Sequence, residues 1–119
     1  MKRIIPSHIY EGQPCSVVAV GCAMGLVDGL GRLVSPDLHD DGYLSLNSMN
    51  RLIRANLIVN RQVKFKKGER PVLRDWAHEN LGKRAVVCVL GHFLFFDGRD
   101  YHSFFWNGGD EVVCVWYLA

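Results

Sequence analysis

The sequence lacks several features that would place a chain in a functional class at once. It has no apolar run approaching the ~18 residues of a membrane-spanning helix, so we expect no membrane partner. The basic start over residues 1–6 is not followed by the apolar segment of a secretory signal. A net charge of +2 is too small to indicate a nucleic-acid partner. We therefore expect a single cytoplasmic domain over residues 1–119, with reduced thiols.

The four cysteines lack the spacing of a metal site. No two of them form the CxxC pattern typical of zinc ligands, so we expect no metal and no other cofactor. Cys22, Cys88 and Cys114 lie in apolar segments, as small core residues do. Only Cys15 follows a turn, the Gly-Gln-Pro of residues 12–14, and precedes a helical segment. Cys15 is therefore the candidate for chemistry.

The segment from Cys15 to about Asp28 is apolar on every side, which predicts a helix buried on most of its surface. Gly29 is well placed to end it. Gly21 and Gly25 each destabilise such a helix by roughly 1 kcal/mol relative to Ala, which suggests a closely packed neighbour, expected to be a sheet. At the helix start, unpaired backbone N–H groups and the helix dipole stabilise a thiolate. The alternative for Cys15 is a buried structural cysteine.

The remaining patterns predict helices first and strands last, which is an α+β arrangement. Apolar spacing indicates the helices, and segments rich in Val, Phe, Tyr and Trp between short turns indicate an antiparallel meander of strands. The expected elements are an edge strand or ordered arm over 2–5, an irregular stretch over 29–43, helices over about 46–57 and 71–80, and strands over 61–67, 84–90, 92–96, 100–106 and 111–118.

A cysteine nucleophile needs a base within hydrogen-bond reach, and the base needs an orienting group. His92 begins a predicted strand, so its ring can project from the end of the sheet. If the two strands on either side of residues 97–100 pair, Asn107 returns beside His92 and can accept the Nδ1–H of the imidazole. Ser103 and Asp110 are alternatives for this orienting role. The alternative for His92 is an ordinary turn histidine.

Several short motifs occur together in this chain. Residues 13–25 read Gln-Pro-Cys-Ser-Val-Val-Ala-Val-Gly-Cys-Ala-Met-Gly. Four further motifs follow it: Pro-Val-Leu-Arg-Asp-Trp-Ala at 71–77, Gly-His-Phe-Leu-Phe-Phe-Asp-Gly at 91–98, Tyr-His-Ser at 101–103 and Val-Trp at 115–116. Together they resemble papain-like cysteine peptidases, most of all the small bacterial and phage-encoded proteins similar to bacteriocin-leader peptidases. The resemblance covers most of the chain apart from residues 29–68.

This resemblance implies an α+β papain-like fold, in which the N-terminal buried helix packs on a C-terminal antiparallel sheet of four to five strands, with the active cleft between them. It implies Cys15 as the nucleophile, His92 as the general base and Asn107 as the orienting residue. The backbone N–H of Cys15 would supply half of an oxyanion hole. In papain-like peptidases a Gln six residues before the Cys supplies the other half. Here that position is Ile9, and Gln13 is the only nearby glutamine.

The first functional prediction is a thiol-dependent hydrolase that acts on a peptide or isopeptide-like amide. The alternative is a catalytically inactive papain-like scaffold that binds a host protein, such as a phage protein that inhibits a host enzyme. The basic stretch over 51–70 and the aromatic run over 104–106 favour the alternative, and reversing the charge of Lys64, Lys66 and Lys67 would test it. A nucleic-acid-binding module, which would bind with a steep salt dependence, is disfavoured.

Overall fold

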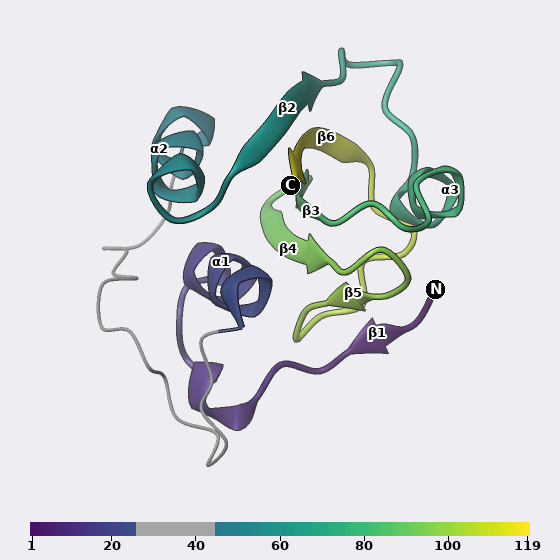
Figure 1. The fold of residues 1–119 in the computed structure, drawn as a ribbon. Coiled ribbons are helices and arrows are strands. Elements are labelled where there is room, and N and C mark those ends of the chain that lie inside the picture. The colour runs from purple at the N-terminus through teal and green to yellow at the C-terminus, as the bar shows by residue number, and fades with distance from the viewer. Residues whose placement is uncertain (26–44) are drawn as a thin grey trace.

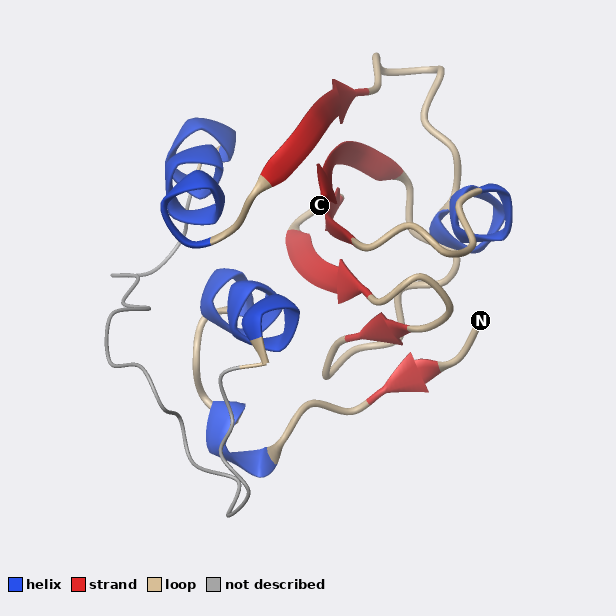
Figure 2. Ribbon diagram, viewed as in Figure 1, coloured by secondary structure: helices blue, strands red, loops and turns tan. Residues whose placement is uncertain are grey.

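The computed structural model describes residues 1–25 and 45–119, in which three α-helices surround one six-stranded sheet (Figure 1; Figure 2). The predicted irregular stretch over 29–43 lies outside the described residues. In chain order the elements are β1 (Arg3–Ile4), the 3-10 helix η1 (His8–Tyr10), α1 (Cys15–Met24), α2 (Leu46–Asn56), β2 (Val59–Lys64), α3 (Leu73–Glu79), β3 (Ala85–Val89), β4 (His92–Phe96), β5 (Tyr101–His102) and β6 (Val112–Leu118).

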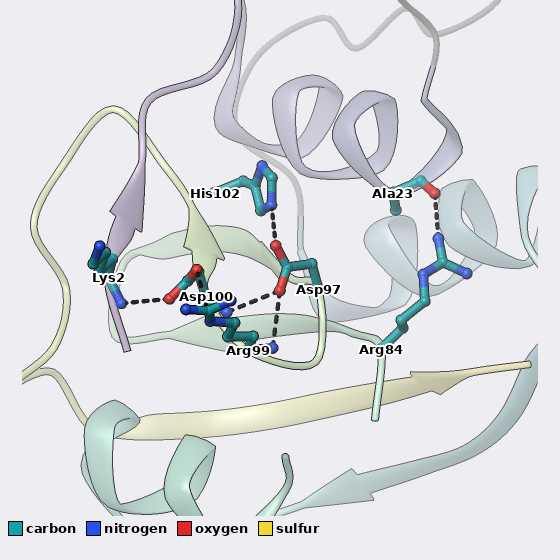
Figure 3. A network of polar contacts seen from close by, with 7 residues as sticks. All are labelled: Lys2, Ala23, Arg84, Asp97, Arg99, Asp100 and His102. Carbon is teal, nitrogen blue, oxygen red and sulfur yellow. Dashed lines mark hydrogen bonds and ion pairs between the residues drawn. The ribbon is translucent and has the colours of Figure 1, made fainter. Parts of the chain in front are cut away.

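The α+β class is confirmed, but the sheet differs from the prediction of four to five antiparallel strands. Its strand order is β1-β5-β4-β3-β6-β2, and β1 pairs with β5 in parallel. The N-terminal strand is held by backbone bonds to β5 and by the backbone N–H of Lys2, which donates to Asp100 Oδ1 at 2.7 Å (Figure 3). The prediction left open whether residues 2–5 join the sheet, and this pairing accounts for the extra strand.

The last four strands do not form a simple meander. β3, β4 and β5 pair in sequence, but β6 returns to the other side of β3 and lies between β3 and β2. The predicted strand over 100–106 is only two residues long, because Ser103 Oγ accepts a hydrogen bond from the Phe105 N–H at 3.1 Å and the chain turns away. Residues 103–111 then carry the chain across the sheet.

Helices cover both faces of the sheet, which explains why β3 is buried at every position (Figure 1). On one face, α1 and α2 pack on alternate strand residues that include Val86, Phe93 and Trp116. On the other face, α3 packs Trp76 against residues of the opposite alternation. The apolar helix predicted to form the core is therefore α1.

The start of α2 is held by a side-chain cap, in which the Ser48 N–H donates to Ser45 Oγ at 3.2 Å.

Gly21 and Gly25 have different roles, and what lies closest to the open side of Gly21 is Tyr10 and not the predicted sheet. Gly25 has a φ of 64° and ends the helix after Met24, so the predicted end near Asp28 is wrong. Gly21 instead packs against Tyr10 of η1, whose ring lies where a side chain at position 21 would begin. Burial, with a smaller contribution from Cys22, raises the pKa of Tyr10 to about 12.

The end of α1 is tied to the start of β3. Arg84 Nη2 donates to the carbonyl oxygen of Ala23 at 2.7 Å (Figure 3). Its guanidinium also lies 5.5 Å from the centroid of the Phe95 ring. A cation at a helix C-terminus also interacts favourably with the helix dipole. This contact helps to fix α1 along its axis, and therefore helps to place Cys15 at its opposite end.

Candidate active site

Cys15 is the first residue of α1, as predicted. Pro14 is the N-cap residue and has no side chain that can cap, and the first intrahelical bond runs from the Val18 N–H to the Pro14 carbonyl at 3.1 Å. The Cys15 N–H therefore has no intrahelical acceptor and points out of the helix start. The Cys15 side chain is half-buried. A backbone donor and a thiol thus share one helix terminus.

Two cavities meet at this terminus. The larger, of about 240 Å³, lies between α1 and the β3–β4 hairpin, and its lining includes Cys15, Cys88, Leu90 and His92. The smaller, of about 60 Å³, is lined by Gln13, Cys15 and His92 and by residues 102–105. Cys15 and His92 line both cavities. The structure therefore brings the predicted nucleophile and base together between the helix and the sheet.

His92 begins β4, as predicted, and its ring is half-buried. Its Nε2 lies 2.9 Å from Ser103 Oγ, and the Phe105 ring stands nearly perpendicular to the imidazole with the ring centroids 5.4 Å apart. Burial lowers the pKa of His92 below 6.5, and the negative charge of Asp110 opposes this shift. The neutral imidazole is therefore the favoured form at neutral pH, as a general base requires.

The orienting residue differs from the first prediction. Asn107 does not contact the imidazole, because Ser103, one of the two alternatives, lies between them. Ser103 Oγ donates to Asn107 Oδ1 at 2.9 Å, and Asn107 Nδ2 donates to Asp110 Oδ2 at 2.8 Å. All three candidates therefore take part in one chain of hydrogen bonds that begins at His92.

His102 is a lining residue that sequence reasoning missed. It lies in the smaller cavity, and its Nε2 is 2.8 Å from Asp97 Oδ2 (Figure 3). Burial raises the pKa of Asp97, but hydrogen bonds from the Asp100 N–H, His102 and the Arg99 N–H outweigh it and give a lowered pKa. A histidine two residues into a predicted strand carries no signal that its ring reaches a neighbouring cavity.

The other cysteines are less suited to act as nucleophiles. Burial raises the pKa of Cys22 to about 11. Burial, with the charges of Cys114 and Cys15, raises the pKa of Cys88 to about 12, although Arg70 opposes it. Cys88 and Cys114 are core residues, as predicted, and Cys22 packs against the core while half-buried. At neutral pH these thiols stay protonated, including Cys88 beside Cys15 in the larger cavity.

The remaining predicted residues lie at the surface. Gln13 is exposed and lines the smaller cavity beside Cys15, so it is near the predicted oxyanion position. Lys64, Lys66 and Lys67 are exposed at and beyond the end of the edge strand β2. In the loop after β5, Phe105 and Trp106 are 63% and 65% exposed.

Neither a protein-family model nor a curated protein or solved structure matches the chain significantly. Within residues 1–25 and 45–119, no three or more His, Cys, Asp or Glu side chains are grouped so that they could hold a metal ion. The helices of the described part are also too short or too polar to cross a membrane. What the structure defines is an α+β domain in which Cys15 and His92 line the same two cavities between the core helix and the sheet.

Proposed function

We propose that this protein is a thiol-dependent hydrolase with a papain-like fold, acting on a peptide or isopeptide-like amide. The observation that carries the proposal is that Cys15, at the start of the buried helix, and His92, at the start of β4, line the same two cavities. A thiol at a helix terminus beside an oriented imidazole is the arrangement that activates a cysteine nucleophile.

In the proposed reaction, Cys15 Sγ attacks the amide carbonyl carbon while His92 takes the thiol proton. The developing oxyanion lies near the start of α1, where the Cys15 N–H can donate to it. His92 then gives the proton to the leaving amine, and a thioester remains on Cys15. Attack by water completes hydrolysis, and attack by another amine completes acyl transfer. Neither step calls on a metal or cofactor.

Gln13 is the candidate for the second oxyanion donor, because it lies beside Cys15 in the smaller cavity. Loss of one such donor typically lowers the rate by ~10²–10³. If Gln13 serves here, Gln13→Ala lowers the acylation rate within that range and leaves Cys15 labelling by a small alkylating agent unchanged. If Gln13 only lines the cavity, both rates stay near those of the unmodified protein.

The larger cavity indicates the substrate class. Leu46, Val89, Leu90 and Val113 provide an apolar lining next to Cys15 and His92. An apolar side chain beside the scissile amide would fill this space and release water from it. We therefore place peptides with an aliphatic or aromatic residue next to the cleaved bond first among candidate substrates.

The proposal is tested with peptide vinyl sulfones, which bind covalently to an activated cysteine. A probe with a leucine side chain next to the warhead should label Cys15, and Cys15→Ala and His92→Ala should abolish labelling. Cys88→Ala is the matched control, because its thiol lines the same cavity and its pKa is raised. Labelling that is equal in the His92→Ala protein, with the fold intact, would overturn the proposal.

A second candidate function is the inactive scaffold that binds a host protein. The observation that favours it is the exposed pair Phe105 and Trp106, since large exposed aromatics are common at protein interfaces. In this case partner binding survives Cys15→Ala and fails when Lys64, Lys66 and Lys67 are reversed in charge. Loss of the biological effect in Cys15→Ala, with folding intact, would instead favour catalysis.

A further inference from the structure

Three consecutive hydrogen bonds lead from His92 to a carboxylate. They join His92 Nε2 to Ser103 Oγ at 2.9 Å, Ser103 Oγ to Asn107 Oδ1 at 2.9 Å, and Asn107 Nδ2 to Asp110 Oδ2 at 2.8 Å. Ser103 and Asn107 are 2% and 5% exposed, so water has little access to the middle of the chain. The Asn107 N–H also donates to the Tyr101 hydroxyl at 3.0 Å, which holds the asparagine in place.

The direction of every bond follows from the carboxylate. An ionised Asp110 can only accept, so Asn107 must present its NH₂ group to Asp110 and its carbonyl oxygen to Ser103. That oxygen can only accept, so the single hydroxyl proton of Ser103 is used there. Ser103 Oγ must therefore accept from His92, and its other lone pair accepts from the Phe105 N–H at 3.1 Å. Every hydrogen-bonding site of Ser103 is then occupied.

We propose that Asp110 is a positioning residue that holds His92 in the Nε2–H tautomer, acting through Asn107 and Ser103. The second nitrogen, Nδ1, then carries the free lone pair and, within the described residues, has no hydrogen-bond partner. This reverses the sequence-based expectation, in which the orienting group accepts the Nδ1–H. Resting on the proposed function, the inference makes Nδ1 the atom that takes the proton when the S–H bond of Cys15 breaks, giving a thiolate and an imidazolium. Nε2 keeps its proton throughout.

Replacing Asp110 by Asn removes the constraint with almost no change of shape. An amide at position 110 can either accept from Asn107 or donate to it. If it donates, Asn107 turns over and gives its NH₂ to Ser103, and Ser103 gives its hydroxyl proton to His92 Nε2. Both directions then satisfy Ser103, so the Asp110→Asn protein should contain both His92 tautomers.

The test is NMR of the full chain labelled with ¹⁵N-histidine, at a pH above the His92 titration. The titratable groups around His92 are Cys15, Cys88 and His102, which share a cavity lining with it, and Asp110, whose charge acts on it. A pH series separates the effects of these groups from the tautomer signal. Two-bond couplings between ring nitrogens and carbon-bound protons identify the protonated nitrogen. We expect Nε2–H alone in the unmodified protein and a clear Nδ1–H population in Asp110→Asn.

Asp97→Asn is the matched control. Asp97 binds His102 directly through its carboxylate, whereas Asp110 acts on His92 only through Asn107 and Ser103. It should change the His102 signals and leave those of His92 in place. Ser103→Ala is the second variant, and it should give a tautomer mixture without touching Asp110. Amide spectra check that each variant is folded.

Nδ1–H in the unmodified protein overturns the inference. So does a His92 that stays in the Nε2–H tautomer alone in both folded variants, Asp110→Asn and Ser103→Ala. A tautomer that follows the prediction while Cys15 reacts as an ordinary thiol supports the positioning role and overturns the proposed function. The two proposals therefore fail separately.

Discussion

Gly21 lies directly against the ring of Tyr10: a Cβ at position 21 would come within 2.5 Å of the phenol oxygen and 2.7 Å of a ring carbon. Tyr10 is 1% exposed, so its ring cannot move aside without disturbing the turn that leads into Cys15. The chain thus uses the one residue without a side chain where η1 crosses the core helix. This contact positions the helix that carries the candidate nucleophile.

Gly21→Ala should therefore destabilise the protein. Overpacking of a core typically costs about 1–3 kcal/mol, and the higher helix propensity of Ala returns roughly 1 kcal/mol. We therefore expect a net loss of up to about 2 kcal/mol in the free energy of unfolding. Denaturant unfolding measures it. Adding Tyr10→Ala tests the cause, because the two losses should then be less than additive. Strict additivity would show that the contact does not carry the effect.

Arg84→Met should weaken the attachment of α1 to the sheet. It removes the charged bond to the Ala23 carbonyl at 2.7 Å and keeps most of the apolar stem. Because Arg84 is an exposed side chain, we expect a loss of only about 0.5–1 kcal/mol in thermal or denaturant unfolding. Lys67→Met, at an exposed cation beyond the end of β2, is the control and should be close to neutral. Equal losses in the two variants would contradict this role for Arg84.

Asp97→Ala should destabilise the protein in a pH-dependent way. Asp97 Oδ1 accepts from the Arg99 and Asp100 N–H groups, and Oδ2 lies 2.8 Å from His102 Nε2, so we expect a loss of about 1 kcal/mol at pH 7. A carboxyl with a lowered folded-state pKa stabilises above its unfolded pKa of about 3.9, and this contribution disappears as the pH falls through the folded value. The difference between the two proteins should therefore shrink below pH 4. A constant difference from pH 7 to pH 3 would contradict this explanation.

In Cys15→Ala, where no thiolate can hold the imidazolium, His92 should titrate below pH 6.5, because burial disfavours its charged form. Its folded-state pKa is lower than its unfolded one, so its contribution to stability is present above pH 6.5 and is lost as the pH falls through the folded value. Removing the charge in Asp110→Asn should lower the pKa further, since that charge now opposes the shift. NMR titration of the ring protons measures the His92 pKa with and without Asp110→Asn. A His92 midpoint above pH 6.5, or a His92 pKa that rises in Asp110→Asn, would contradict this explanation.

The elements of the fold could be predicted where local pattern decides them. α2 and β4 have the predicted bounds to within one residue, because apolar spacing and flanking glycines are local signals. The end of α1 was predicted at the wrong glycine, Gly29 in place of Gly25, because either glycine can end a helix and only the folded chain selects Gly25. The place of β6 beside β3 depends on the turn that the chain makes at Ser103, and strand propensity does not predict this turn.

The two main residues of the candidate site could be predicted from the sequence. The hydrogen bonds that join His92 to Ser103, Asn107 and Asp110 could not. Cys15 and His92 follow from residue type and position, one at a helix start and one at a strand start. Which of the three candidates contacts the imidazole of His92 depends on differences in position of about one side-chain length. These positions are set by the path of residues 103–111. Sequence reasoning can name Ser103, Asn107 and Asp110 together, but only the structure orders them in a chain.

The most direct measurement is the rate of iodoacetamide alkylation at Cys15 against pH, in the unmodified and His92→Ala proteins, with each modified site located by peptide mass. We expect Cys15 to react readily at pH 6–7, where an isolated thiol is almost fully protonated, and to lose this reactivity in His92→Ala. Cys22 and Cys88, whose pKa values are raised to about 11 and about 12, are slow internal controls in the same sample. A Cys15 that reacts only at alkaline pH, with the same profile in both proteins, would contradict the account.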